Sequence, residues 1–245
     1  MFGRKKNNKD EPITATKAAV VAGDPQEDSD SLRANGPYDI AEVDSREGYL
    51  DLGSILLKPQ PGVGVRLEVD EKTKRPRAIN LDVAGSTAQI QAFAAPKSSG
   101  LWEQVRRDLK ASLEGNKGAP ESVEGTFGVE LRARFPAKTS DGTTGYRPAR
   151  FVGIDGPRWF LRTVISGAAA VDPDASKAFD DLIRGLVVVR GKDPMPPRDL
   201  LPLTIPDNAQ REDPAASQAP SNRRGRRAKR DIAPPERGPE TAEVR

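Results

Sequence analysis

The chain has 245 residues, 36% of them hydrophobic, and a formal net charge of +3. It contains neither cysteine nor histidine, which excludes disulfides, thiolate nucleophiles, zinc ribbons, His-ligated metals and Ser-His-Asp triads. The hydrophobic share is low for a uniformly globular chain, so we expect one domain, residues 37–206, between disordered tails at 1–36 and 207–245.

Basic and acidic residues are nearly equal in number over the expected domain. We therefore expect no broad basic field of the kind that a dedicated nucleic-acid-binding fold carries. The basic residues at 1–9 are followed by no apolar stretch, and no apolar run approaches the roughly 18 residues that a membrane span needs. The sequence accordingly predicts a cytoplasmic protein without a membrane span.

The first regular segments are predicted to be strands, because apolar and polar residues alternate along them. Residues 63–69 predict a strand with one buried face, and residues 79–83 predict its hairpin partner after a charged connection. Residues 88–95 are a candidate third strand.

The spacing of apolar residues then changes to that of a helix. Its apolar positions are Trp102, Val105, Leu109 and Leu113, with charged residues between them. This pattern predicts an amphipathic helix packed on the sheet. Ser98 or Ser99 is the expected N-cap, and Gly115 is the expected C-terminal stop.

Strands are predicted again at 127–135 and 149–154. The sequence Asp-Gly-Pro-Arg at 155–158 predicts a turn, because Asp-Gly tolerates positive φ and proline cannot continue a central strand. Residues 159–166 predict the return strand.

A second helix is predicted to begin at Asp172, an N-cap followed by proline at the favoured first helical position. Residues 187–189 predict a short strand, and residues 199–203 predict an extended segment along the surface. Consecutive strands joined by short loops imply antiparallel pairing. The expected fold is therefore α+β, a mainly antiparallel sheet of about six strands with two amphipathic helices packed on it.

Four stretches carry a resemblance to a known family: Ala-Phe-Ala-Ala-Pro at 92–96 with Gly-Leu-Trp at 100–102, Gly-Thr-Phe-Gly-Val-Glu-Leu-Arg at 125–132, the segment 150–162, and Val-Val-Arg-Gly at 188–191 with Pro-Pro-Arg-Asp-Leu-Leu-Pro-Leu at 196–203. Together, over Tyr38 to Pro206, they resemble an actinobacterial family of domains of unknown function, the 3710 family. The resemblance implies an actinobacterial cytoplasmic protein and no particular activity. The order of segments also resembles the small antiparallel sandwich of photosystem-associated and nuclear-import accessory proteins, which implies a fold only.

A group of arginines is the first candidate site. Alternation places Arg158, Phe160 and Arg162 on one face of their strand, with Arg150 on the strand before. Two arginines around a phenylalanine could bind a phosphate or carboxylate, or stack on an aromatic group. The alternative is a partly solvated sheet face on which the arginines pair with nearby carboxylates. The predicted surface comprises Arg150, Asp155, Arg158, Phe160 and Arg162.

The loop before the first predicted helix is a weak candidate for anion binding. Lys97, Ser98 and Ser99 lie where unpaired N–H groups favour anions. The glycine spacing of a phosphate-binding P-loop is missing, so ordinary helix capping is the favoured interpretation.

A basic cluster in the C-terminal tail is the third candidate. Six positive residues lie within residues 222–230: Arg223, Arg224, Arg226, Arg227, Lys229 and Arg230. Such clusters bind nucleic acid, acidic proteins or anionic lipid through counterion release, and the alternative interpretation is a solvated, solubilising tail. Because the cluster has no aromatic residue for base stacking, we expect any nucleic-acid binding to be nonspecific.

No residue is predicted to be catalytic, because the carboxylate pairs Asp180-Asp181 and Glu121 with Glu124 lie in no apolar setting that would raise a pKa. No cofactor or metal is predicted. The preferred interpretation is a non-enzymatic module that presents an arginine-bearing sheet face to a protein partner. The alternative is a nucleic-acid-associated accessory protein that uses the basic tail.

Overall fold

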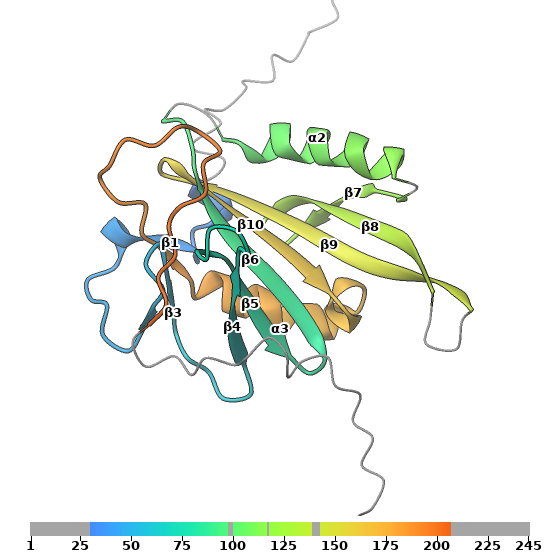
Figure 1. Ribbon diagram of the computed structural model, residues 1–245, viewed down its shortest axis with the longest axis horizontal. Helices are drawn as coiled ribbons and strands as arrows, with labels where there is room; N and C mark the ends of the chain where they lie inside the picture. Colours follow the sequence, from blue (N-terminus) through green and yellow to red (C-terminus); the bar gives the residue numbers. More distant parts are fainter. Residues whose placement is uncertain (1–29, 98–99, 117, 139–142, 207–245) are drawn as a thin grey trace, which may run out of the picture. The chain divides into compact units, whose positions relative to one another are not determined.

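A seven-stranded antiparallel sheet forms the centre of the fold (Figure 1). The computed structural model describes residues 30–97, 100–116, 118–138 and 143–206. The strand order across the large sheet is β4-β5-β6-β10-β9-β8-β7. The strands are β4 (Gly64–Val69), β5 (Pro76–Val83), β6 (Ser86–Ala94), β7 (Glu121–Gly125), β8 (Gly128–Lys138), β9 (Thr144–Gly156) and β10 (Trp159–Ser166).

A second, small sheet has the order β1-β11-β3-β2. Its strands are β1 (Tyr38–Asp39), β2 (Leu50–Asp51), β3 (Ile55–Leu57) and β11 (Val187–Val188). Strands β1 and β11 are parallel, whereas β3 is antiparallel to both β2 and β11. Strands of two or three residues are too short to show alternation, so the sequence predicted only the segment around β11.

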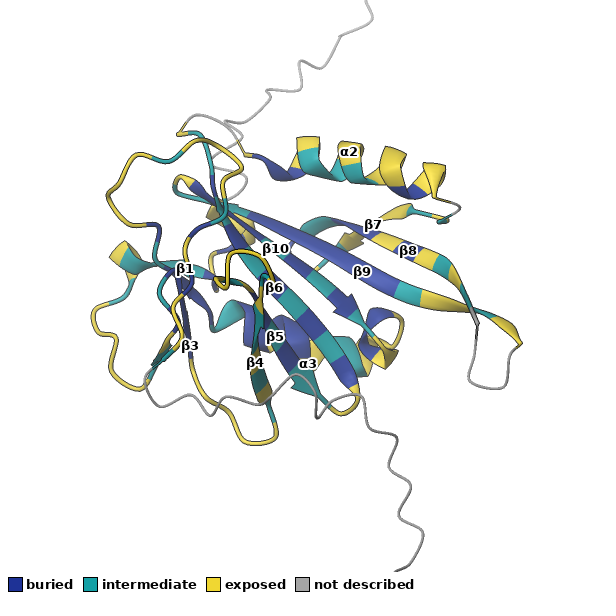
Figure 2. Cartoon of the chain, viewed as in Figure 1, coloured by how far each residue is buried: buried dark blue, intermediate teal, exposed yellow. Residues whose placement is uncertain are grey.

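Alternation decides which side chains each face of the large sheet presents. Along β6 buried and half-buried residues alternate without a break (Figure 2). The buried set lies on what we call the core face, where β6 contributes Ile90 and β10 contributes Leu161. Helix α3 (Pro173–Arg184) packs on this face through Phe179 and Leu182. Two short 3-10 helices, η1 (Ile40–Glu42) and η2 (Ala168–Ala170), also lie in the described residues, and residues 30–32 are helical.

The opposite face of the large sheet is only partly covered. Helix α2 (Trp102–Gly115) packs there against β8 and β9. Its Trp102 lies directly on Gly153 of β9, where a Cβ atom would come within 2.1 Å of the indole. The tryptophan can therefore pack only because residue 153 has no side chain. Strands β4, β5 and β6 carry half-buried polar residues on this face, as described below.

An extended C-terminal segment joins the two sheets. The backbone N–H of Leu201 donates to the carbonyl of Ala92 on β6, and Leu203 forms a bridge with Gly53 beside the small sheet. Both leucines are buried, and Leu201 is fully buried. The prediction that residues 199–203 run along the surface is therefore wrong, because this segment supplies core side chains and backbone pairing.

The N-terminal boundary of the structured region also lies earlier than predicted. Arg33, which we placed in a disordered tail, is 5% exposed and pairs with Asp30 and Glu42. Its guanidinium lies 5.9 Å from the ring centroid of Trp159. Single contacts between a tail and a distant tryptophan leave no periodic pattern in the sequence. Residues 1–29 and 207–245 lie outside the described residues.

The predicted fold class is confirmed, because the protein is α+β with a large antiparallel sheet and few helices. Both predicted helices are present, and the second begins as predicted at Pro173 after its N-cap Asp172. The prediction of Ser98 or Ser99 as the N-cap of the first helix is wrong, because Leu101 is the N-cap and the helix begins at Trp102. The strand count differs from the predicted six, because β1, β2, β3 and β7 were not predicted.

Candidate functional site

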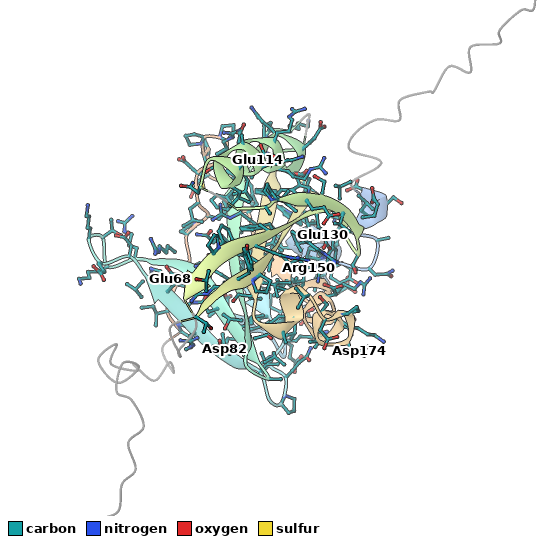
Figure 3. All side chains as sticks on the ribbon, turned by 90° about the vertical axis from the view of Figure 1, so that its right-hand side faces the viewer. Glu68, Asp82, Glu114, Glu130, Arg150 and Asp174 are labelled. Atoms are coloured by element: carbon teal, nitrogen blue, oxygen red, sulfur yellow. The ribbon has the colours of Figure 1, made fainter. Side chains whose placement is uncertain are left out.

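The structure separates the five residues of the predicted arginine surface. Arg150 lies on the core face, 2% exposed, between β8 and α3 (Figure 3). Its Nε and Nη2 donate to the two carboxylate oxygens of Glu130 at 2.6 and 2.5 Å. Its Nη1 donates to Asp180 Oδ1 at 2.8 Å and to Ser176 Oγ at 3.1 Å. Arg150 is thus the centre of a buried ion cluster.

The buried ion cluster engages four of the five N–H donors of Arg150, and its burial leaves the guanidinium inaccessible to a ligand. Burial by itself would lower the pKa of Arg150, but the hydrogen bonds and charges of Glu130 and Asp180 outweigh burial and raise it. Thr126 Oγ1 donates to the second oxygen of Asp180 at 2.5 Å. The cluster fixes α3 against β8 and β9. The alternative interpretation expected arginines paired with carboxylates on a partly solvated face, whereas this pairing of Arg150 is buried.

Asp155 caps the helix on the opposite face. It accepts a hydrogen bond at 2.7 Å from the backbone N–H of Leu101 and another at 3.1 Å from that of Trp102. Burial raises the pKa of Asp155, and these two backbone hydrogen bonds oppose the rise. Leu101, the N-cap residue, makes no side-chain cap of its own. The carboxylate of a distant strand therefore satisfies the helix start.

Phe160 and Arg158 do not form a surface with Arg162. Phe160 is 2% exposed and stacks with both Phe93 and Trp102, at centroid distances of 6.0 and 6.1 Å. Arg158 lies in the turn between β9 and β10 with φ +64°, and its side chain is exposed. Alternation did predict the face of Phe160, but that face is covered at this point by α2.

Arg162 is the one predicted residue that reaches a partly open sheet surface. Its guanidinium carbon lies 5.5 Å from the ring centroid of Phe93, and its Nη2 donates to Gln91 Oε1. Its Nε is buried without a hydrogen-bond partner, and within the described ranges it makes no salt bridge. Burial lowers the pKa of Arg162. A half-buried cation has lost part of its hydration, and without a nearby anion this loss is not compensated.

Polar side chains of β4, β5 and β6 surround Arg162 on the same face. We call this surface the open face, and it comprises Arg66, Glu68, Arg77, Asn80, Asp82, Thr87, Gln89, Gln91 and Arg162. Figure 3 shows Glu68 and Asp82 on these strands, away from the buried cluster. All of these side chains are half-buried or exposed.

The charges of the open face, apart from Arg162, pair with one another. Arg66 Nε donates to Asp82 Oδ2 at 2.7 Å, and this hydrogen bond lowers the pKa of Asp82. Arg77 Nε donates to Glu68 Oε1 at 2.8 Å. Gln91 Nε2 donates to the backbone carbonyl of Arg77 at 3.1 Å. A hydrogen-bonded chain thus runs from Arg162 through Gln91 to the Arg77–Glu68 pair.

A hollow of about 610 Å³ lies beside α2 on the same face of the sheet. Its side chains come from β8, β9 and β10: Phe135, Pro136, Ala137, Arg147, Pro148, Ala149, Phe151, Val164 and Ser166. Arg147 is exposed and forms no salt bridge with any residue that the structure describes.

The structure describes only part of the remaining predicted sites. Lys97 is exposed, and Ser98 and Ser99 lie outside the described residues. The basic cluster at 222–230 also lies outside them. Within the described ranges there is no group of three metal-ligating side chains. No helix in the same ranges is long and apolar enough to cross a membrane.

Sequence reasoning missed most of the open face. Most of its members were available as polar positions of the predicted strands 63–69, 79–83 and 88–95, but no site was predicted on them. Their convergence on Arg162 depends on β6 pairing with β10, a contact between segments some 70 residues apart. Strand pairing at that separation is not visible in a single sequence.

Comparison with known proteins gives a family but no activity. The solution structure of cyanobacterial PsbP (CyanoP) from Synechocystis sp. PCC 6803 is similar with a TM-score of 0.32 and 9% sequence identity, over 56% of this chain and 87% of that one. No curated protein matches the chain. Residues 36–212 match the model of the family described as "Protein of unknown function (DUF3710)". The chain therefore belongs to this uncharacterised family.

Proposed function

We propose that the protein is a non-enzymatic interaction module whose docking surface is the open face around Arg162. The observation that carries the proposal is the guanidinium of Arg162, half-buried, bonded to the neutral Gln91 and paired with no carboxylate among the described residues. Leaving a cation in this state is unfavourable, and a ligand that supplies an anion removes the cost.

The chemistry of the face favours a protein partner that carries a carboxylate. Because Arg66 pairs with Asp82 and Arg77 with Glu68, one cation remains for an incoming group. A carboxylate matches the planar donors of arginine better than a neutral group does. The glutamines and Asn80 add donors and acceptors for the polar groups around it. We therefore propose an acidic protein segment as the partner.

The test compares two arginines of the same charge. Full-length protein, Arg162→Glu and Arg158→Glu are used as bait in the native cell extract, and the bound proteins are quantified. We expect Arg162→Glu to lose at least one abundant partner about tenfold or more, and Arg158→Glu, in the turn, to retain it. Equal retention by both folded variants would remove the open face from consideration.

The alternative function, nonspecific nucleic-acid association, rests on the basic cluster at 222–230. It predicts binding whose log affinity falls steeply with log salt and whose slope shrinks when residues 222–230 are deleted. Failure of the full chain to bind single- or double-stranded DNA or RNA at low salt would eliminate it. We further propose a cytoplasmic location in an actinobacterium, as the sequence resemblance implies, and cell fractionation tests that location.

A further inference from the structure

The hollow beside α2 has a polar end and an apolar end. Phe151 pairs in register with Val164, and Ala149 pairs with Ser166 one step along the same face. Arg147 lies two residues beyond Ala149 on β9, so it is the diagonal neighbour of Ser166 on that face. A cation and a hydroxyl therefore stand together at one end, and apolar side chains continue from them toward α2.

The apolar end is bounded by the aromatic packing under α2. Phe151 is 9% exposed and Val164 is half-buried, and both contact the cluster that contains Trp102. Beyond Phe151, Gly153 is covered by the indole of Trp102. The accessible part of β9 thus runs from Arg147 to Phe151, about 13 Å at roughly 3.3 Å per residue. Apart from Arg147 and Ser166, every side chain that lines the hollow is apolar.

The charge of the hollow is positive and uncompensated. Arg147 is exposed and has no ion pair in the described part of the chain. The hydroxyl of Ser166 makes a single long contact, 3.4 Å, with the carbonyl of Thr87. A volume of about 610 Å³ falls in the range of small-molecule sites, which are mostly apolar with a few polar groups that fix orientation.

We propose that this hollow binds an amphipathic monocarboxylate with an unbranched chain of medium length. The carboxylate contacts the Arg147 guanidinium and the Ser166 hydroxyl, and the chain lies over Ala149, Phe151 and Val164 with its end toward Trp102. Arginine recognises a carboxylate by two parallel hydrogen bonds, and the apolar floor supplies the remaining binding free energy. The site is independent of the open face, since its cation is Arg147 and not Arg162.

Decanoate and 1-decanol are the test ligands, because they share a chain and differ in charge. Each is titrated below its aggregation concentration into the full-length protein and followed by calorimetry. We expect saturable binding of decanoate and about tenfold or more weaker binding of decanoate to Arg147→Gln, with decanol unaffected by that change. Arg134→Gln is the matched control, because Arg134 is an exposed β8 residue on the opposite face from Phe135.

The orientation of the chain is tested by fluorescence. A bromine on carbon 10 of decanoate is expected to quench Trp102 more strongly than a bromine on carbon 2, and the difference is expected to disappear in Trp102→Phe. The proposal is overturned if decanoate does not saturate, if Arg147→Gln and Arg134→Gln weaken it equally, or if the two bromine positions quench equally. Arg162→Glu is expected to leave decanoate binding unchanged, so failure here is distinguishable from failure of the docking surface.

Discussion

Arg162 lies over the ring of Phe93, with its guanidinium carbon 5.5 Å from the ring centroid. Phe93 in turn stacks on Phe160, which stacks on Trp102 of α2. The aromatic series thus connects the packed part of this sheet face to the polar part. Arg162 lies at the boundary between these two parts. Its guanidinium contacts the ring of Phe93 and pairs with no carboxylate among the described residues. This position is the basis of the proposed docking surface.

Replacing Arg150 with methionine is expected to destabilise the protein by about 3–5 kcal/mol, because Glu130 and Asp180 would be left buried without a counter-charge. Urea denaturation measures the change. Arg132→Met is the control, since Arg132 is the exposed register partner of Arg150 on β8. The control is expected to stay within about 0.5 kcal/mol.

A second substitution distinguishes the buried ion cluster from simple loss of packing. Adding Glu130→Gln and Asp180→Asn to Arg150→Met removes the two unpaired charges, so part of the lost stability is expected to return. If the triple variant is less stable than Arg150→Met, uncompensated charge is not the source of the loss.

The contact between Trp102 and Gly153 predicts that Gly153→Ala is destabilising by about 1–3 kcal/mol, although alanine normally favours a strand over glycine. The added methyl group would displace the indole and loosen α2. Gly115→Ala, at the end of α2 with open space around it, is expected to be neutral or stabilising by up to about 1 kcal/mol. Thermal unfolding of both variants checks these opposite signs, and equal shifts would contradict them.

Asp155 predicts a specific dependence of stability on pH. Burial raises its pKa in the folded protein above the ordinary aspartate value of about 4. Between the two pKa values the folded protein binds more protons than the unfolded chain, so this group's contribution falls as pH rises through that window. Asp155→Asn keeps an acceptor for the Leu101 and Trp102 amides and cannot titrate.

The free energy of unfolding of the wild type is therefore expected to fall relative to that of Asp155→Asn as pH rises above about 4. Urea titrations at intervals up to pH 7 measure it. A constant difference would show that the helix amides fully offset the effect of burial, and a difference that moves in favour of the wild type would show that they outweigh it; either result contradicts the prediction.

The sequence predicted those features that local pattern determines. Alternation identified β4, β5, β6 and β10, and the pair Asp172-Pro173 identified the start of α3. It also assigned Leu161 to the core face and Phe160 to the opposite face, which the structure bears out. The sequence pattern could not show that α2 covers Phe160, because the position of a helix over a sheet depends on tertiary contacts.

The candidate site was predicted only in part for a related reason. Arg150 and Arg162 are equivalent in local sequence, each an arginine in an apolar strand, yet Arg150 faces Glu130 and Asp180 whereas Arg162 faces Gln91. Their opposite surroundings follow from register between strands distant in sequence. The C-terminal segment was misassigned likewise, since Leu201 becomes buried only by pairing with β6.

The most direct test of the docking surface is site-specific photo-crosslinking in the native cell. A photoreactive phenylalanine replaces Asn80 on the open face or, as control, Lys177, an exposed residue of α3 on the other side of the sheet. We expect a discrete protein adduct from position 80 that disappears when Arg162→Glu is added, and no such adduct from position 177. Absence of an adduct at position 80, or an adduct there that survives Arg162→Glu, would contradict the proposal.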